Sequence, residues 1–198
     1  MTILERTMKK EKTGSVPIWF MRQAGRYLPE YQALKKDRGF MELVMDSDAA
    51  AEITLQPVRR FDVDAAIIFS DILVILHALD MEVSFDHGLP EISRTVDTES
   101  AIKETVQNYS KDRLFDRLSF YTAALKKTRA GLSAEKSLLG FAAAPFTLAS
   151  YMVEGKTSKT HAKTRGWMYA DPKTFGKLMD FIVDATVHLI EDKRFLMR

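Results

Sequence analysis

Two arginines four residues apart lie in an unusually apolar stretch near the start of the chain. Arg22 and Arg26 have aromatic or apolar neighbours: Trp19, Phe20, Met21 and Tyr27. Arginine is rarely buried without a partner, so two arginines in such surroundings require anions. Because a guanidinium grips a carboxylate through two parallel hydrogen bonds, the pair suits a ligand with several carboxylates. The alternative is an ordinary ion pair within the fold, which is how buried arginines are usually satisfied.

Asp71 is the strongest candidate for a catalytic group. It follows an apolar run at residues 65–69, whose length and β-branched residues predict a buried parallel strand. Active sites of α/β barrels lie at the C-terminal ends of their strands. A carboxylate in an apolar pocket is costly unless it meets donors or positive charge. The alternative role for Asp71 is to cap a helix that begins at Ile72.

A second buried strand is predicted at residues 137–143, where Pro145 ends the run. A helix over residues 146–154 follows, closed by Gly155, and it carries Tyr151. The tyrosine hydroxyl can serve a ligand or be satisfied within the core. Strand-like runs separated by helices favour an α/β fold with parallel strands.

The remaining chain is expected to be mainly helical. Residues 1–15 are expected to form a loose leader and residues 156–165 a polar loop. A hairpin is predicted from residues 81–85 and 92–96. Helices are predicted at 31–44 with an interruption near Gly39, from 48 with a kink or restart at Pro57, and at 98–109, 112–130 and 172–190.

Composition excludes several classes of function. The 198 residues fit one domain, and 29 basic against 27 acidic residues are too balanced for a nucleic-acid-binding face. With no cysteine there is no disulfide or thiolate metal site, and the four histidines lack metal-ligand spacing. The first 15 residues lack the apolar core of a signal peptide, and no apolar run approaches the ~18 residues of a membrane span. We therefore expect a soluble, cytoplasmic protein without metal.

Three stretches of the chain resemble the uroporphyrinogen decarboxylase family. They are residues 17–31 (PIWFMRQAGRYLPEY), 52–73 (EITLQPVRRFDVDAAIIFSDIL) and 140–155 (GFAAAPFTLASYMVEG). The resemblance implies a TIM (β/α)8 barrel. A closed barrel needs eight strands and typically about 250 residues, whereas only two convincing barrel strands are predicted here. We therefore expect residues 1–198 to form a single, incomplete barrel domain, the N-terminal portion of the enzyme. The closing EDKRFLMR departs from the family, and we interpret it as truncation or a frameshift near residue 190.

The resemblance implies a carboxy-lyase of tetrapyrrole (haem) biosynthesis. It would remove CO₂ from the four acetate side chains of uroporphyrinogen III and give coproporphyrinogen III. Protonation of a pyrrole turns the ring itself into an electron sink, so no cofactor is expected. The resemblance also implies a homodimer if the full-length fold forms. The balanced charge and the lack of a long apolar run predict no nucleic-acid and no membrane partner.

The resemblance assigns roles to particular residues. Asp71 would accept hydrogen bonds from pyrrole N–H groups and stabilise the positive charge that develops on ring protonation. Arg22 and Arg26 would bind carboxylates, with Arg22 also near the proton transfer, although the pKa of arginine makes it a poor proton donor. The Tyr151 hydroxyl would contact substrate near the aspartate. Further donors would be the main-chain N–H groups of Gln23, Ala24 and Gly25.

Two other readings remain open at this point. The first is a truncated, catalytically inert part of the same enzyme that lacks the C-terminal half of the barrel. The second is a corrinoid-linked methyltransferase of related fold. Such enzymes use a zinc site with cysteine, and a chain without cysteine argues against that reading.

Overall fold

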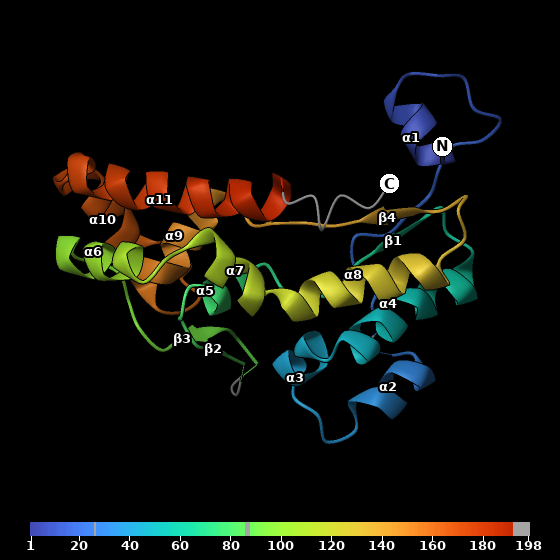
Figure 1. Ribbon diagram of the computed structural model, residues 1–198, viewed down its shortest axis with the longest axis horizontal. Helices are drawn as coiled ribbons and strands as arrows, with labels where there is room; N and C mark the ends of the chain where they lie inside the picture. Colours follow the sequence, from blue (N-terminus) through green and yellow to red (C-terminus); the bar gives the residue numbers. More distant parts are fainter. Residues whose placement is uncertain (26, 86–87, 192–198) are drawn as a thin grey trace. The chain divides into compact units, whose positions relative to one another are not determined.

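The protein folds into two compact units, seen in a computed structural model that describes residues 1–25, 27–85 and 88–191 (Figure 1). The first unit is made of residues 1–71 and 120–141. The second unit is made of residues 72–119 and the described residues from 142 onward.

Two short parallel strands run through the first unit. β1 (Ala65–Ile67) pairs with β4 (Ser137–Leu139), and Ala66 lies beside Leu138 in the register. The pairing extends past both strands, because the Ile68 N–H donates to the Leu139 carbonyl at 3.0 Å. Both predicted parallel strands are confirmed, although each is shorter than the apolar run that indicated it.

The first unit also contains helices. They are α1 (Ile3–Met8), α2 (Pro29–Lys35), α3 (Phe40–Met45), α4 (Ser47–Phe61) and α8 (Ser119–Gly131). Asp46 caps α4, since its Oδ1 accepts from the N–H groups of Asp48 and Ala49. The helix continues through Pro57 to Phe61 instead of restarting, because proline removes only one hydrogen bond of the ladder. The helix packs against β1, and its Val58 lies in a buried cluster with Val63, Ala66 and Leu132.

Residues 1–15, expected as a loose leader, include the helix α1. Its N-terminus carries a capping box in which the Glu5 carboxylate accepts from the Thr2 N–H and the Thr2 hydroxyl accepts from the Glu5 N–H. The Thr2 hydroxyl also lies 2.5 Å from the Ser137 hydroxyl at the start of β4. The first helix is therefore tied to the strand pair through its cap.

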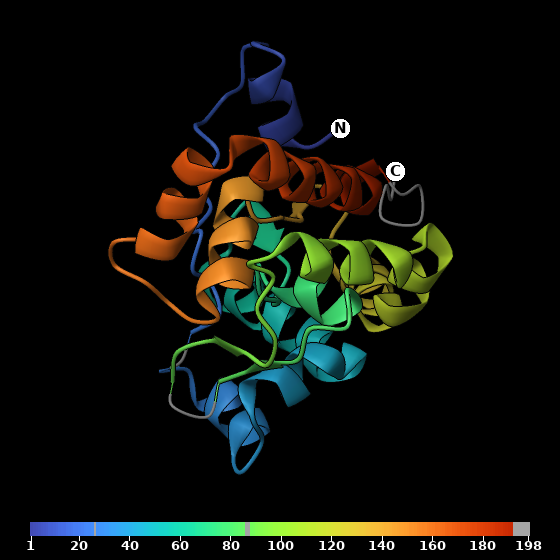
Figure 2. The same ribbon diagram turned by 90° about the vertical axis from the view of Figure 1, so that its left-hand side faces the viewer.

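The second unit is mostly helical. Its elements are α5 (Val74–Ala78), β2 (Val83–Ser84), β3 (Glu91–Ile92), α6 (Glu99–Gln107), α7 (Lys111–Arg117), α9 (Pro145–Glu154), α10 (Ala162–Ala170) and α11 (Pro172–Glu191). The antiparallel pairing of β2 with β3 confirms the predicted hairpin. The long helix α11 packs against α9 and α10, as both views show (Figures 1 and 2). Asp171 caps this helix, because its Oδ1 accepts from the Thr174 N–H at 3.1 Å.

Two helix predictions need correction. The single helix expected at 112–130 is divided into α7 and α8, because Leu118 leaves the helical region at φ −94° and ψ 12°. A one-residue break leaves the apolar spacing almost unchanged, so periodicity cannot detect it. The polar loop expected at 156–165 ends early, because α10 already begins at Ala162.

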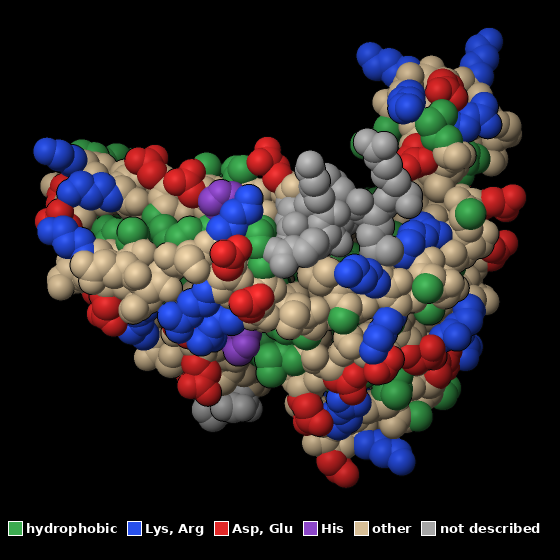
Figure 3. All heavy atoms as spheres, viewed as in Figure 1, with side chains coloured by type: hydrophobic (Ala, Val, Ile, Leu, Met, Phe, Trp, Pro, Cys, Tyr) green, Lys and Arg blue, Asp and Glu red, His purple; other side chains and the backbone are tan. Residues whose placement is uncertain are grey.

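Two features of the structure concern nucleic-acid binding and membrane spanning, which composition argued against. Basic and acidic side chains are interspersed over the face shown in Figure 3. Among the described residues, no helix is long and apolar enough to cross a membrane.

Candidate functional site

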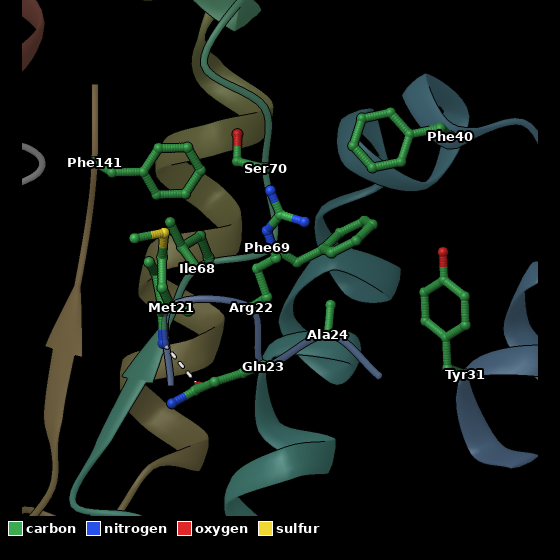
Figure 4. A pocket seen from close by; sticks show the side chains of 11 residues that line it. Met21, Arg22, Gln23, Ala24, Tyr31, Phe40, Ile68, Phe69, Ser70 and Phe141 are labelled. Atoms are coloured by element: carbon green, nitrogen blue, oxygen red, sulfur yellow. Dashed lines mark hydrogen bonds between the residues drawn. The ribbon is translucent and has the colours of Figure 1, made fainter. Parts of the chain in front are cut away.

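A cavity of about 530 Å³ opens in the first unit where β1 ends (Figure 4). Its walls come from the loop at residues 21–24, from residues 67–70, and from Tyr31, Phe40 and Phe141. The volume lies in the range of small-molecule sites, which are mostly apolar with a few placed polar groups. The predicted arginine loop and the predicted strand end thus meet at one cavity.

One side of the cavity is aromatic. Phe69 contacts Phe40 edge-on, with ring centroids 5.5 Å apart, and Tyr31 at 6.3 Å. Edge-to-face packing holds the three rings in fixed orientations. This wall suits a flat apolar ring. The sequence did not single out this wall, because Phe40 lies outside the family-like stretches and Tyr31, at the end of residues 17–31, was not assigned a role.

Arg22 lines the cavity, and its side chain extends toward Ser70 (Figure 4). The residue is exposed, and so are its apolar neighbours Phe20 and Met21. The sequence argument assumed burial in apolar company, and that premise is wrong for Arg22. Within the described part of the chain Arg22 forms no ion pair, so its guanidinium is available to an anionic ligand. Arg26, the other predicted arginine, lies outside the described residues.

Ser70 was not predicted as a site residue. It lines the cavity, and its Oγ is buried without a hydrogen-bond partner among the residues that the structure describes. A buried hydroxyl without a partner is unusual and requires an explanation. The only signal in the sequence was its place directly before Asp71.

Asp71 is half-buried and lies just beyond the end of β1, directly after Ser70. The next helix, α5, begins at Val74. The predicted placement of this carboxylate after a parallel strand is therefore confirmed. Its catalytic role stays a prediction.

Gln23 and its neighbours occupy the loop as predicted, with one difference. The Gln23 side chain is buried, with an exposed fraction of 6%, and both ends of its amide bond to β1. The side chain is thus committed to the fold, and only the main chain of this residue remains for the predicted substrate contact. Ala24 lines the cavity, and Gly25 is buried but is not among the lining residues.

Tyr151 belongs to the second unit and is not among the residues that line the cavity. It lies half-buried on α9, with its hydroxyl 3.5 Å from the Thr157 hydroxyl. Glu154, at the end of the same helix, accepts hydrogen bonds from the backbone and hydroxyl of Thr164. Glu154 therefore serves the fold as a partner of Thr164.

The described residues also bear on metal binding. No three histidine, aspartate or glutamate side chains gather as metal ligands in the parts of the chain that the structure describes. The cavity itself brings together the Arg22 guanidinium, the Ser70 hydroxyl and an aromatic wall, whereas Asp71 follows Ser70 in the chain and is not among the lining residues.

Comparison with known proteins identifies the family. The family model for uroporphyrinogen decarboxylase matches residues 1–192. The uroporphyrinogen decarboxylase of Rhizorhabdus wittichii is 48% identical over 182 residues, which cover 90% of this chain and 51% of that protein. The enzyme of Histophilus somni strain 129Pt is 44% identical over 194 residues, which cover 94% of this chain and 54% of that protein.

A solved structure supports the fold. The methyltransferase from Methanosarcina mazei matches with a TM-score of 0.72 at 17% identity, over 95% of this chain and 54% of that one. The chain thus spans about half the length of the relatives it matches. The predicted fold class, an α/β barrel of which two parallel strands are described here, is confirmed. The chain belongs to the uroporphyrinogen decarboxylase family.

Proposed function

We propose that this chain takes part in the decarboxylation of uroporphyrinogen III to coproporphyrinogen III. The observation that carries the proposal is the cavity at the end of β1, where Arg22 lines the wall and Asp71 follows the strand. Family membership supports the substrate class. The relatives of which this chain spans half are named uroporphyrinogen decarboxylases.

The chemistry asks two things of the protein. It must bind several carboxylates, and it must stabilise a ring that becomes positive when a pyrrole carbon is protonated. The bond between the acetate methylene and its carboxylate then breaks, CO₂ leaves, and the bonding electrons enter the ring. The methylene takes up a proton to become a methyl group, and the ring gives one back.

The residues divide these tasks. Arg22, exposed at the cavity, is suited to hold an acetate or propionate group through paired hydrogen bonds. Asp71 supplies a negative charge fixed in advance, which stabilises the protonated ring in the transition state. The edge-to-face rings of Phe40 and Phe69 offer a surface for a pyrrole. The roles of Arg26 and Tyr151, and the expected single barrel domain, homodimer and cytoplasmic location, stay predictions.

An anaerobic assay tests the proposal. The 198-residue chain is incubated with uroporphyrinogen III, the products are oxidised, and the carboxylates on each pigment are counted by chromatography. We expect pigments with seven to four carboxylates, which Asp71→Asn should abolish. Asp62→Asn is the matched control, because Asp62 is an exposed aspartate of the same unit whose side chain bonds Lys136.

The activity of Asp71→Asn tests the role of that residue, and the activity of the parent chain tests the proposed function. Unchanged turnover in Asp71→Asn would remove that residue from the mechanism. If the folded chain yields only the eight-carboxylate pigment, the alternative of a catalytically inert part of the enzyme is favoured.

A further inference from the structure

The two edges of β1 are satisfied by different partners. The Asp64 carbonyl accepts from the Ser137 N–H, and the Ile68 N–H donates to the Leu139 carbonyl, each at 3.0 Å. These groups face β4. Because backbone groups alternate in direction along a strand, those of Ala65 and Ile67 face the opposite edge.

The side chain of Gln23 occupies that opposite edge. Its Nε2 donates to the Ala65 carbonyl at 2.6 Å, and its Oε1 accepts from the Ile67 N–H at 3.1 Å. A primary amide presents a donor and an acceptor side by side, as a peptide group does. Gln23 therefore replaces one residue of a neighbouring strand, although it is 42 residues from Ala65 in the chain.

A second attachment lies five residues earlier in the same loop. The Ile18 N–H donates to the Asp64 carboxylate at 2.7 Å, and the Asp64 N–H donates to the Ile18 carbonyl at 2.8 Å. Between the two attachments the side chains are largely exposed: Trp19 at 38%, Phe20 at 54% and Met21 at 72%. Exposed side chains supply little packing to fix a loop, so its position depends on the attachments.

We propose that Gln23 is a positioning residue that clamps the loop of residues 18–23 to the free edge of β1. The clamp sets Arg22 against the strand end that leads to Asp71. The part of this inference that concerns substrate rests on the proposed function. The part that concerns the clamp does not.

The first experiment measures the clamp without any ligand. Amide hydrogen exchange of Ile67 is followed by NMR in Gln23→Met, which keeps the size of the side chain and removes its acceptor. We expect exchange of Ile67 to become about tenfold faster, because its N–H loses its partner. Gln56→Met is the matched control, since Gln56 is also buried but lies on α4 and bonds only Glu52 in the described structure. Unchanged exchange at Ile67 in Gln23→Met would overturn the proposal.

The second experiment follows the loop itself. In a Trp167→Phe background, Trp19 is the only tryptophan, so its quenching by acrylamide reports the loop. Quenching should rise in Gln23→Met and stay unchanged in Gln56→Met. Gln23→Glu provides a variant in which the clamp can be restored by pH. Its ionised carboxylate repels the Ala65 carbonyl, whereas the protonated carboxyl again offers one donor and one acceptor. Its quenching should return toward the parent value as the pH is lowered from 8 to 5. A lower melting temperature in Gln23→Met with quenching unchanged would mean a merely structural role and would overturn the proposal.

The third measurement connects the clamp with catalysis. Gln23→Met should lower kcat/KM for uroporphyrinogen III by about ten- to a hundredfold, since small misplacements of a binding group have effects of that size. Gln56→Met should retain the parent value. An inactive parent chain would refute the proposed function, whereas the exchange and quenching results would still decide the clamp. An active Gln23→Met variant with parent kinetics would overturn the positioning role.

Discussion

Gly25 is required for space rather than for its backbone angle. Glycine is often needed where φ is positive, but the described glycines with positive φ are Gly88 and Gly155. A Cβ at residue 25 would lie 2.6 Å from Leu28 Cγ and 2.9 Å from its Cδ1. Leu28 is almost fully buried, so it cannot easily move aside.

We therefore expect Gly25→Ala to lower the free energy of unfolding by about 1–3 kcal/mol, the usual cost of overpacking. Urea unfolding of the chain measures it. Gly176→Ala is the control with the opposite sign. That glycine lies inside α11 with open space around it, and alanine should add about 0.5–1 kcal/mol. A stabilised Gly25→Ala variant would contradict the packing described here.

The buried phenol of Tyr121 makes the free energy of unfolding depend on pH in the alkaline range. Burial raises the pKa of Tyr121 to about 12, from an ordinary value of 10.0. The unfolded chain therefore loses this proton first, so the stability it confers is complete below pH ~10 and is lost as the pH rises toward 12. In Tyr121→Phe, the free energy of unfolding should fall between pH 8 and 11 by about 1 kcal/mol less than in the parent chain.

Tyr169→Phe serves as the comparison for this pH series, because its side chain is 76% exposed. Urea unfolding at pH 8, 10 and 11 gives the free energy of unfolding as a function of pH for the parent, Tyr121→Phe and Tyr169→Phe. Equal losses in Tyr121→Phe and the parent would show that the phenol does not titrate between the folded and unfolded states as its burial implies.

At the scale of elements, Glu154 couples the end of α9 to the start of α10. The residue at the N-cap of α10, His161, contributes no side-chain cap, and Glu154 Oε1 accepts from both the N–H and the hydroxyl of Thr164 at 3.0 Å. Burial alone would raise the pKa of Glu154, but the hydrogen bonds from Thr164 lower it. The carboxylate thus acts as a cap supplied from a different helix.

Glu154→Gln should lower the melting temperature at pH 7, because a neutral amide accepts more weakly than a carboxylate. Because the pKa of Glu154 is lower in the folded chain, its charge stabilises the fold at pH values above the ordinary pKa of glutamate. This stabilisation is lost as the pH falls through the pKa of Glu154 in the folded chain. The difference between parent and variant should therefore shrink below about pH 4. The control is Glu135→Gln, at an exposed position outside the helices. It should leave the melting temperature unchanged both at pH 7 and below pH 4. If the melting temperatures of parent and Glu154→Gln still differed at pH 3, the charge of Glu154 would not be the cause of the difference.

The elements that could be predicted from sequence are those with a local cause. Residues 65–67 and 137–139 lie in short apolar runs, and α11 was predicted at residues 172–190. The start of α10 was hidden because it follows a polar stretch, and its cap comes from Glu154. Local propensity contains no information about a cap supplied from another helix.

The same distinction applies to the site. Arg22 and Asp71 were identified from motifs, and the structure places their segments at one strand end. The clamp made by Gln23 could not be predicted, because it depends on backbone groups 42 and 44 residues away. Nor could the exposure of Arg22, since a run of aromatic and apolar residues ordinarily indicates burial.

At the scale of the whole molecule, the two units offer a direct test of cooperativity. Each unit holds one of the two tryptophans, Trp19 in the first and Trp167 in the second. The first unit is built on a parallel pair of strands only three residues long, and parallel strands are normally stable within larger, covered sheets. The second unit is built on the 20-residue helix α11 and the helices packed against it.

We therefore expect the first unit to unfold at lower urea concentration. In Trp167→Phe the fluorescence of Trp19 should give a lower midpoint than the fluorescence of Trp167 in Trp19→Phe. Circular dichroism of both variants should follow the parent chain, which shows that neither substitution changes the transition itself. Small single domains usually unfold in one step that all probes report alike. Coincident midpoints would thus mean that the two units fold as one cooperative domain, whereas separated midpoints would mean that the strand pair with the candidate site opens while the helices around α11 remain folded.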